Sequence, residues 1–272
     1  RYLGEVGELG PEKRKHLRQI NNIVEKMLEA GMLRNAEEEC VCDLGAGKAQ
    51  LSYWISSVSE RSHFLLVDRM GSRNKWDNRA LREKPSLKMH RIRCSIEHLD
   101  LRKVREVQGT RRVISVCKHL CGSGTDAGVR CMMRVEGEDR GGNDEKRSVQ
   151  EGEKREKWEG LVLAPCCAHK ARYAEYLGRA FLATLSMDSL ESFAALRHIC
   201  TWGTCGLTMR EDDGEEGGRM SSAWKTRMGR VAKAVMELGR ARFIEERGFT
   251  VEVVRYVPYA TSPENLLIIA KR

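Results

Sequence analysis

The chain has 272 residues, 41% of them hydrophobic, and a formal net charge of +9. This length and apolar content suit one large α/β domain with a buried core. No apolar run approaches the roughly 20 residues of a membrane-spanning helix and no signal peptide opens the chain, so we expect no membrane-embedded segment. The basic excess favours a polyanion such as nucleic acid or an anionic membrane surface as partner.

The cysteine content favours an intracellular protein. Disulfide frameworks are typical of short secreted chains, whereas several of the ten cysteines here, such as Cys42 and Cys117, fall inside apolar runs. We therefore expect reduced thiols and a cytoplasmic or nuclear location. The first residue is Arg1 and not Met, which indicates part of a longer protein.

The first predicted element is a helix over residues 16–30. Leu17, Ile20, Val24 and Met27 recur at helical spacing, and Gly31 provides a stop. We interpret residues 1–38 as an N-terminal helical extension of a single domain that covers 1–272.

Short β-rich runs then alternate with helical stretches, which indicates a parallel sheet with crossover connections. The last two runs are linked directly through a segment with Pro258 and Pro263, which suits an antiparallel pair. The predicted fold is α/β and Rossmann-like, as in class I methyltransferases: a mostly parallel seven-stranded sheet with one antiparallel strand and helices on both faces. The predicted strands are residues 39–44, 63–68, 88–94, 112–117, 160–164, 251–256 and 266–270.

Two stretches read as flexible insertions, at residues 134–157 and 210–220. The first is densely charged, with Val135 and Val149 as its only aliphatic residues, and the second is rich in Gly and acidic residues. Neither can bury enough apolar surface to order itself. The strand pattern continues on both sides of each, so neither is a predicted domain boundary.

A glycine-rich turn follows the first predicted strand. The segment Asp43-Leu44-Gly45-Ala46-Gly47 precedes a helical stretch, and glycines let a backbone turn sharply and approach a ligand closely. The dinucleotide fingerprint G-x-G-x-x-G is incomplete, because Gln50 occupies its third glycine position. A P-loop is excluded by its spacing. The D-x-G-x-G form resembles the first motif of methyltransferases, and an ordinary tight turn is the alternative.

Two further strand ends extend this candidate cofactor site. Asp68 ends the second strand, where a carboxylate can accept hydrogen bonds from ribose hydroxyls; a helix N-cap is the alternative role. Ser95 follows the third strand, where many methyltransferases have an Asp that binds the adenine amino group. A hydroxyl is a weaker acceptor, so we expect adenine recognition to depend more on the Ile96 backbone. The predicted cofactor-binding residues are Asp43, Gly45, Ala46, Gly47, Asp68, Arg69, Ser95, Ile96 and Cys117.

Candidate reactive side chains follow the fourth and fifth strands. Ligands of open α/β sheets bind beyond the carboxyl ends of the strands, so these side chains are expected near a bound methyl donor. Each has a structural alternative, because a lone His is usually a satisfied structural residue and a Cys at a strand end is usually a small buried hydrophobe. The predicted catalytic residues are Lys118, His119, Asp126, Cys166 and His169.

Four segments make the resemblance to a family specific: KHLCGSGTDAG, APCCAHK, TWGTCG and SPENLLIIAKR. They are similar to the tRNA 2′-O-methyltransferase family that modifies nucleotide 4 of the acceptor stem, in order from about Gly31 to Arg272 apart from the two insertions. The resemblance implies S-adenosylmethionine as cofactor, the tRNA acceptor stem as partner and a ribose hydroxyl as methyl acceptor. Family members also carry N-terminal zinc fingers, which this chain lacks, so we interpret it as a trimmed catalytic domain.

The chain departs from the family pattern at two positions. Ala168 stands where relatives have the first His of C-C-H-H, and Ser95 stands where they have Asp. The first change bears on any metal or acid–base role of that cluster, and the second bears on cofactor affinity.

The predicted chemistry needs alignment and a base. A ribose hydroxyl is a poor nucleophile until its proton is removed, and alignment of the reacting atoms can contribute roughly 7–11 kcal/mol. A general base adds typically about 10²–10⁴-fold. We favour Lys118 as base or hydroxyl orienter, which requires a lowered pKa, with His119 as the competing base and Asp126 in support.

A basic helix is predicted over residues 224–247. Its cations can contact RNA phosphates, and the alternative is a packed helix with a solvated basic face. A minor groove of A-form RNA exposes 2′-hydroxyls without base flipping. The predicted RNA-binding residues are Lys48, Arg73, Lys75, Lys170, Arg227, Arg230, Lys233 and Arg240.

Three alternatives remain open. One is a cytosine-C5 methyltransferase with Cys166 or Cys121 as nucleophile, because Pro165-Cys166 is faintly similar to the proline-cysteine motif of those enzymes. Another is a non-catalytic RNA-binding module, which the changes at Ser95 and Ala168 allow. A zinc site that combines Cys166, Cys167 and His169 with either Cys117 or Cys121 is disfavoured, because adjacent cysteines lack the usual C-x₂-C spacing. We therefore predict no metal.

Overall fold

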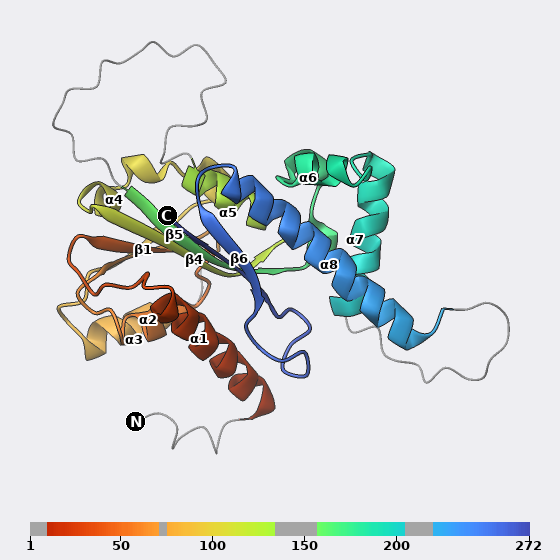
Figure 1. Cartoon of the computed structure of the whole chain (residues 1–272). Helices are drawn as coiled ribbons and strands as arrows, with labels where there is room; N and C mark the ends of the chain where they lie inside the picture. The colour runs from red at the N-terminus through yellow and green to blue at the C-terminus, as the bar shows by residue number, and fades with distance from the viewer. Residues whose placement is uncertain (1–9, 71–74, 134–156, 205–219) are drawn as a thin grey trace, which may run out of the picture. The chain divides into compact units, whose positions relative to one another are not determined.

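The computed structural model describes residues 10–70, 75–133, 157–204 and 220–272, without the side chains of His119 and Lys157. One seven-stranded sheet has the order β3-β2-β1-β4-β5-β7-β6 (Figure 1). The strands are β1 (Glu39–Leu44), β2 (His63–Asp68), β3 (Met89–Arg93), β4 (Arg112–Cys121), β5 (Lys157–Cys166), β6 (Thr250–Arg255) and β7 (Leu266–Lys271). The α-helices are α1 (Pro11–Glu29), α2 (Gln50–Ile55), α3 (Trp76–Glu83), α4 (Arg105–Gln108), α5 (Ser123–Met133), α6 (Arg179–Thr184), α7 (Leu190–Thr204) and α8 (Ser222–Glu245). Short 3₁₀ turns are η2 (Ile96–His98), η3 (Leu101–Lys103), η5 (Ala168–Lys170) and η6 (Tyr173–Glu175).

The strand directions confirm the predicted fold class. β1 pairs in parallel with β2 and β4, and β2 pairs in parallel with β3. β6 and β7 are neighbours joined by only ten residues, 256–265, and Tyr256 N donates to Asn265 O across this link at 3.0 Å. A link this short suits an antiparallel pair, because parallel neighbours need a crossover of about a dozen residues or more.

Burial follows the position of each strand in the sheet. Every residue of β1 is buried, as are the four central residues of β2, because strands inside a parallel sheet are covered on both faces. β3 is short, carries Arg91 and Arg93, and lies at the edge of the sheet. Charge on a short edge strand discourages pairing with other chains. In Figure 1, α2 and α3 lie on one face of β1 and β2, and α4 lies on the other.

The chain divides into two compact units that alternate along the sequence. One comprises residues 20–118, 127–163 and 271–272 and contains β1, β2 and β3. The other comprises residues 1–19, 119–126 and 164–270 and contains α6, α7 and α8. We call them the β1–β3 unit and the α8 unit. The boundaries fall inside β4 and β5, and the single domain over 1–272 stays a prediction.

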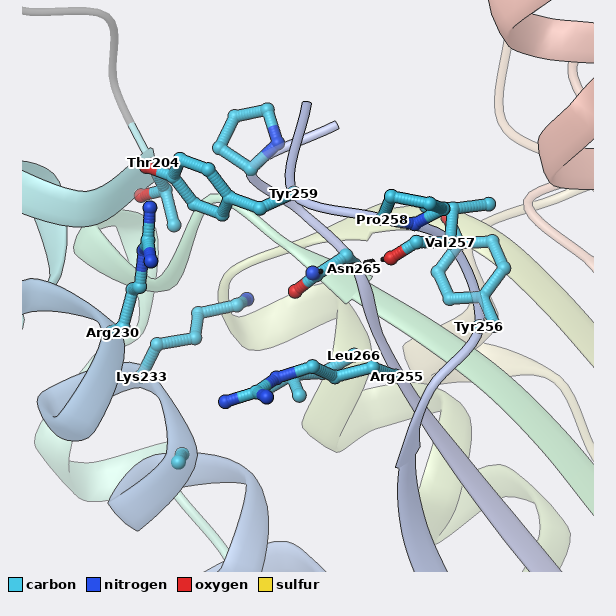
Figure 2. A pocket seen from close by; sticks show the side chains of 12 residues that line it. Thr204, Arg230, Lys233, Arg255, Tyr256, Val257, Pro258, Tyr259, Asn265 and Leu266 are labelled. Atoms are coloured by element: carbon cyan, nitrogen blue, oxygen red, sulfur yellow. Dashed lines mark hydrogen bonds between the residues drawn. The ribbon is translucent and has the colours of Figure 1, made fainter. Parts of the chain in front are cut away.

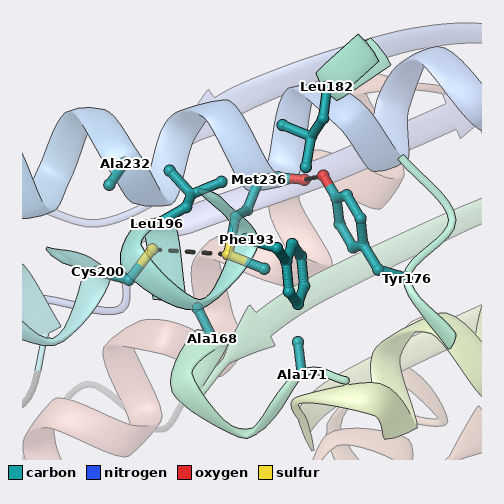
Figure 3. Packing of buried hydrophobic residues seen from close by; sticks show 9 residues of the cluster. All are labelled: Ala168, Ala171, Tyr176, Leu182, Phe193, Leu196, Cys200, Ala232 and Met236. Atoms are coloured by element: carbon teal, nitrogen blue, oxygen red, sulfur yellow. Dashed lines mark hydrogen bonds between the residues drawn. The ribbon is translucent and has the colours of Figure 1, made fainter. Parts of the chain in front are cut away.

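The α8 unit has its own apolar core between α7 and α8 (Figure 3). Nine buried residues form it: Ala168, Ala171, Tyr176, Leu182, Phe193, Leu196, Cys200, Ala232 and Met236. The two helices approach most closely at Gly203 and Gly229, where a Cβ built on Gly203 would lie 2.7 Å from Arg230 N and one built on Gly229 would collide with Gly203 N. Only glycine fits at this crossing.

Other sequence predictions have mixed outcomes. The boundaries of β1 and β2 match the predicted ones, and β4 and β5 extend further than predicted, to Cys121 and Cys166. The two predicted insertions lie outside the described residues apart from Lys157, which begins β5, and Met220. Among the described helices, none is long and apolar enough to cross a membrane.

The glycine crossing generates a stability prediction. Alanine normally stabilises a helix interior by about 1 kcal/mol relative to glycine, but at Gly229 the added methyl group meets the α7 backbone. We expect Gly229→Ala to lower the free energy of unfolding by about 1–3 kcal/mol, measured by urea denaturation. Leu238→Ala, at an exposed position of the same helix, is the control and is expected to change stability little. A stabilised Gly229→Ala variant would contradict this packing.

Candidate functional site

The glycine turn after β1 has the backbone shape that the sequence predicts. Gly45 and Gly47 have φ of +80° and +51°, a region that side chains rarely adopt. Gly45 N and Ala46 N both donate to Val67 O, at 2.8 and 3.0 Å, so the turn is fixed against the end of β2. A Cβ built on Gly47 would meet nothing within 4 Å. The turn therefore borders open space that a ligand could fill.

Asp68 holds the turn from the second strand. Its Oδ2 accepts a hydrogen bond from Gly47 N at 2.7 Å, and its Oδ1 accepts one from Met70 N at 2.7 Å. The residue is half-buried, and each carboxylate oxygen has two lone pairs, so acceptor capacity is left for a ligand. Helix α3 has Lys75 as its N-cap, so Asp68 does not cap that helix.

Asp43 is a buried carboxyl beneath the turn. It is 2% exposed and accepts a hydrogen bond from Ser52 Oγ at 2.5 Å. Desolvation raises the pKa of Asp43 to about 6, against the opposing effects of the Ser52 hydrogen bond and the positive charges of Arg91 and Lys118. At neutral pH the site thus contains a buried negative charge, which is unfavourable for folding and favours a cationic ligand.

Lys118 lies beside the turn on the next strand. β1 and β4 are parallel and pair Asp43 with Val116, which places Lys118 at the level of Gly45, two residues further along. Its positive charge acts on Asp43, and its side chain is half-buried. Cys117, also predicted here, is buried. The structure thus brings Lys118 together with the glycine turn and Asp43 in the β1–β3 unit. The side chain of His119 lies outside the described residues.

Glu97 is a residue of this site that the sequence analysis missed. Ser95 Oγ donates to Glu97 Oε2, and this hydrogen bond is the main reason that the pKa of Glu97 lies below its usual value. The exposed Arg69 also acts on Glu97, and Ile96 between them is buried. An acid two positions after Ser95 was the available signal.

Three thiols gather in the α8 unit. Cys121 ends β4, Cys166 ends β5 and Cys167 follows, and their Sγ atoms all lie within 4.8 Å of one another. Burial and the neighbouring Cys121 raise the pKa of Cys166 far above its usual value, so its thiolate is scarce. A nucleophilic cysteine needs the opposite environment, which argues against Cys166 as the nucleophile of a cytosine-C5 methyltransferase. His169 is half-buried, in η5.

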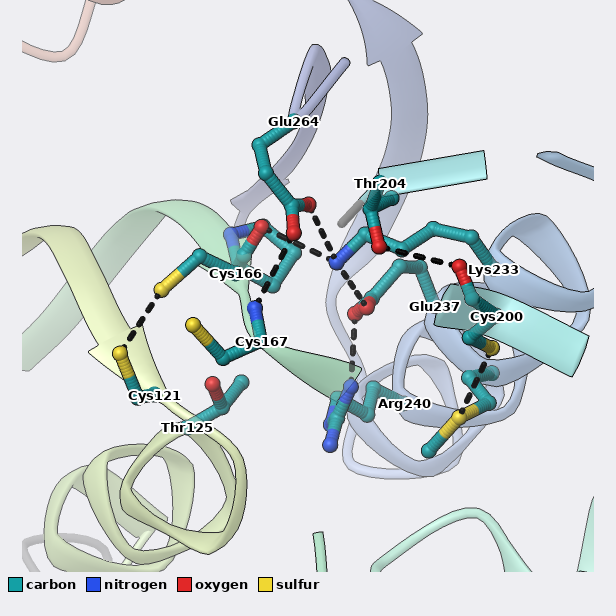
Figure 4. Close-up of polar contacts among 12 residues, drawn as sticks. Cys121, Thr125, Cys166, Cys167, Cys200, Thr204, Lys233, Glu237, Arg240 and Glu264 are labelled. Atoms are coloured by element: carbon teal, nitrogen blue, oxygen red, sulfur yellow. Dashed lines mark hydrogen bonds and ion pairs between the residues drawn. The ribbon is translucent and has the colours of Figure 1, made fainter. Parts of the chain in front are cut away.

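A buried ion-pair network corrects two predictions (Figure 4). Arg240 is 1% exposed and donates to Asp126 Oδ1 at 3.0 Å, to Asp126 Oδ2 at 2.8 Å and to Glu237 Oε2 at 2.9 Å. Lys233 is 2% exposed and pairs with Glu237 and Glu264. The predicted RNA contact of Arg240 is wrong, because this cation is buried and fully paired. The RNA contact of Lys233 stays a prediction, since Lys233 is paired but also lines the pocket described below. Asp126 was predicted to support the base, but its oxygens are occupied by Arg240 and by Leu177 N, so its role is structural.

Other predicted RNA contacts remain available at the surface. Lys48, Lys170, Arg227 and Arg230 are exposed and Lys75 is half-buried, whereas Arg73 lies outside the described residues.

A basic pocket of about 520 Å³ lies in the α8 unit (Figure 2). Arg230, Lys233 and Arg255 line it together with Tyr259, Thr204 and the link between β6 and β7. The Arg230 guanidinium lies 3.3 Å from the centre of the Tyr259 ring. Within the described chain, neither Arg230 nor Arg255 forms an ion pair. Sequence analysis missed Arg255 and Tyr259, because their proximity to Arg230 depends on the packing of α8 against β6.

The comparisons with known proteins identify one family. A sequence profile described as "Methyltransferase TRM13" matches residues 18–271. The "tRNA:m(4)X modification enzyme TRM13 homolog" of Homo sapiens is 27% identical over 96% of this chain and 65% of its own length. The "tRNA:m(4)X modification enzyme TRM13" of Saccharomyces cerevisiae is 24% identical over 95% of this chain and 63% of its own length. The chain thus spans somewhat less than two thirds of these relatives.

Among solved structures, the methyltransferase domain of bacterial CtHen1 is similar with a TM-score of 0.44 and 11% identity, over 95% of this chain and all of that one.

Asp43 generates a prediction on stability against pH. Its pKa is about 6 in the folded chain and 3.8 without burial, so between these values the unfolded chain releases a proton that the folded chain retains. The free energy of unfolding should therefore fall as pH rises through this window, by up to about 3 kcal/mol. Urea denaturation between pH 4 and 7 measures this dependence. In Asp43→Asn, the decrease in the free energy of unfolding over this pH range should be absent.

The control for this prediction is Ser52→Ala. It deletes the hydrogen bond that opposes the shift, so the window should extend to higher pH. Identical pH profiles for the original chain and Asp43→Asn would contradict the assigned burial effect.

Proposed function

Because the chain belongs to the TRM13 methyltransferase family, we propose that it transfers a methyl group from S-adenosylmethionine to tRNA, on the ribose 2′-hydroxyl of nucleotide 4 in the acceptor stem. The observation that carries the proposal is the open glycine turn, tied to Asp68 by the Gly47 hydrogen bond and flanked by Lys118. An open glycine turn beside an acidic strand end is consistent with the methyl transfer that the family name describes. We also propose a cytoplasmic or nuclear location, where tRNA is the available substrate.

The residues of the β1–β3 unit fit the proposed methyl donor. The empty space over Gly47 allows a ligand to lie against the backbone, and the remaining lone pairs of Asp68 can accept from ribose hydroxyls. Ile96 N and Glu97 replace the missing Asp at the adenine: the Glu97 carboxylate accepts from Ser95 and can accept from an exocyclic amino group as well. Asp43 attracts the positive end of the donor.

The chain's own contribution to the reaction is orientation and proton removal. When bound, S-adenosylmethionine supplies an activated methyl group on a sulfonium, so strong nucleophilic activation is not required. Lys118 would orient the ribose hydroxyl and take its proton as the methyl–sulfur bond breaks and the carbon–oxygen bond forms. The ammonium of Lys118 first has to lose a proton, and a neighbouring cation favours that loss.

The pocket of the α8 unit is the proposed place for RNA phosphates. Arg230 and Arg255, which have no carboxylate partner among the described residues, bring two positive charges to a space large enough for a nucleotide unit. Tyr259 holds the Arg230 guanidinium by its ring. Phosphate contacts of this kind position an RNA without reading its sequence. Arg227 and Lys170 are further exposed cations of the α8 unit.

The function is tested by product mapping. Purified chain is incubated with labelled S-adenosylmethionine and unmodified tRNA, followed by nuclease and alkaline digestion. We expect label in one dinucleotide that resists alkali, since a methylated 2′-oxygen cannot attack the adjacent phosphate. Label on a base would overturn the ribose assignment. RNA binding without any donor binding would support the alternative of a non-catalytic module.

Lys118 is tested within the same assay. We expect Lys118→Ala to reduce kcat by about 10²–10⁴-fold with the Kd for S-adenosylmethionine nearly unchanged, because the loss falls on the reacting hydroxyl. Lys118→Arg keeps the charge but cannot act as a base, so it should be almost as slow. Full activity of Lys118→Ala would remove Lys118 from the mechanism.

The basic pocket predicts salt-dependent binding. Arg230→Ala combined with Arg255→Ala should weaken tRNA binding and reduce the slope of log Kd against log salt by about two, one for each phosphate contact. Fluorescence anisotropy at several salt concentrations measures this slope. Arg242→Ala is the matched control, because Arg242 is exposed on α8 and pairs with Glu245. An equal effect of both changes would show a diffuse charge effect and no phosphate site.

A further inference from the structure

The thiols of Cys121, Cys166 and Cys167, the three-thiol cluster, form a compact group in the α8 unit (Figure 4). The Sγ atoms of Cys121 and Cys166 are 3.1 Å apart, and all three Sγ atoms lie within 4.8 Å of one another. Cys166 is 6% exposed, Cys167 is half-buried and Cys121 lies at the surface. The group is thus largely enclosed and accessible from one side.

The backbone is shaped to bring these three side chains together. Cys167 is a non-glycine residue with φ of +45°, a conformation that costs of order 1–3 kcal/mol and persists only where surrounding contacts enforce it. Gly122 has φ of +56°, and a Cβ there would collide with the Lys170 backbone. The segment after Cys166 therefore packs directly on the residue after Cys121.

Charged side chains hold the Cys166–Cys167 turn in place. Lys233 Nζ donates to Pro165 O at 3.2 Å, and Cys167 N donates to Glu264 Oε1 at 3.1 Å. Lys233 and Glu264 form an ion pair at 3.0 Å, so the two hydrogen bonds are connected through that pair. The arrangement resembles the outer-shell contacts that orient the ligands of a metal site.

The spacing of the sulfur atoms suits a tetrahedral metal. Zinc–thiolate bonds are about 2.3 Å long, so two thiolates of a tetrahedral site lie about 3.8 Å apart. The Cys121–Cys166 distance of 3.1 Å lies below this value, and the 4.8 Å limit on all three separations lies above it. Three thiols and no carboxylate form a soft donor set, which selects zinc over magnesium or calcium.

From this geometry we propose that the three-thiol cluster binds one zinc ion, with water completing the coordination shell. Three S–H bonds are exchanged for three zinc–sulfur bonds, and the thiol protons pass to solvent. The ion joins the end of β4 to the turn after β5 and so stabilises the α8 unit. The proposal stands independently of methyl transfer, because it rests on the cysteines alone.

The test is metal binding by the whole purified chain under reducing conditions. Chelator-treated protein is titrated with Zn²⁺ against a chromophoric chelator, and metal content is measured by mass spectrometry after gel filtration. We expect one zinc per chain and a higher melting temperature with zinc. Cys121→Ser and Cys166→Ser should each weaken zinc binding by at least about tenfold. Cys94→Ser, a half-buried cysteine outside the cluster, should leave it unchanged.

The Cys121→Ser variant separates loss of zinc binding from misfolding, since Cys121 is exposed and its substitution leaves the core intact. Co²⁺ substitution adds a readout that does not depend on stability: thiolate-to-cobalt charge-transfer absorption should appear in the original chain and weaken in Cys121→Ser. Absence of bound zinc, or equal zinc affinity in the original chain and in Cys121→Ser, would overturn the proposal.

Discussion

The hydrogen bond from Gly47 N to Asp68 Oδ2 is the contact on which the proposed activity depends. It joins residues 21 positions apart and fixes the turn after β1 to the end of β2. Parallel pairing of β1 with β2 and β4 brings these ends to one edge, and positive φ at Gly45 and Gly47 keeps the space above the turn clear of side chains. Asp43 lies beneath it as a buried charge that folding alone does not favour. A cationic methyl donor would compensate that buried negative charge.

A second constraint shapes the α8 unit. Asp126, Glu237 and Arg240 form a buried set of ion pairs, and Lys233 connects that set to Glu264 and to the Cys166–Cys167 turn. Buried ion pairs are weak sources of stability but are costly to break singly. Their main effect here is positional, since they align α8 with the loop that carries the three-thiol cluster. The glycine crossing of α7 and α8 places Arg230 at the rim of the basic pocket.

Much of the fold could be predicted from the sequence, because β1 and β2 are short β-rich runs separated by helical stretches and their ends are clear. β4 exceeds its predicted length because Lys118 and Cys121 extend it beyond the apolar run. β5 exceeds its predicted length at both ends, to Lys157 and Cys166. Asp43, Gly47, Asp68 and Lys118 could be placed together because strand ends meet at one edge. The burial of Lys233 and Arg240 was not predicted. Both lie seven residues apart on the α8 face that also carries the buried Met236, which was a usable sign of burial. The three-thiol cluster depends on backbone geometry at Gly122 and Cys167 that no spacing rule contains.

The most direct test of the central claim is a crystal structure of the chain with S-adenosylhomocysteine. The account predicts that the ribose hydroxyls lie on the Asp68 carboxylate, that the sulfur lies above the Gly45–Gly47 turn, and that the adenine amino group faces Glu97. A well-ordered product bound elsewhere, with the turn at Gly47 empty, would contradict it.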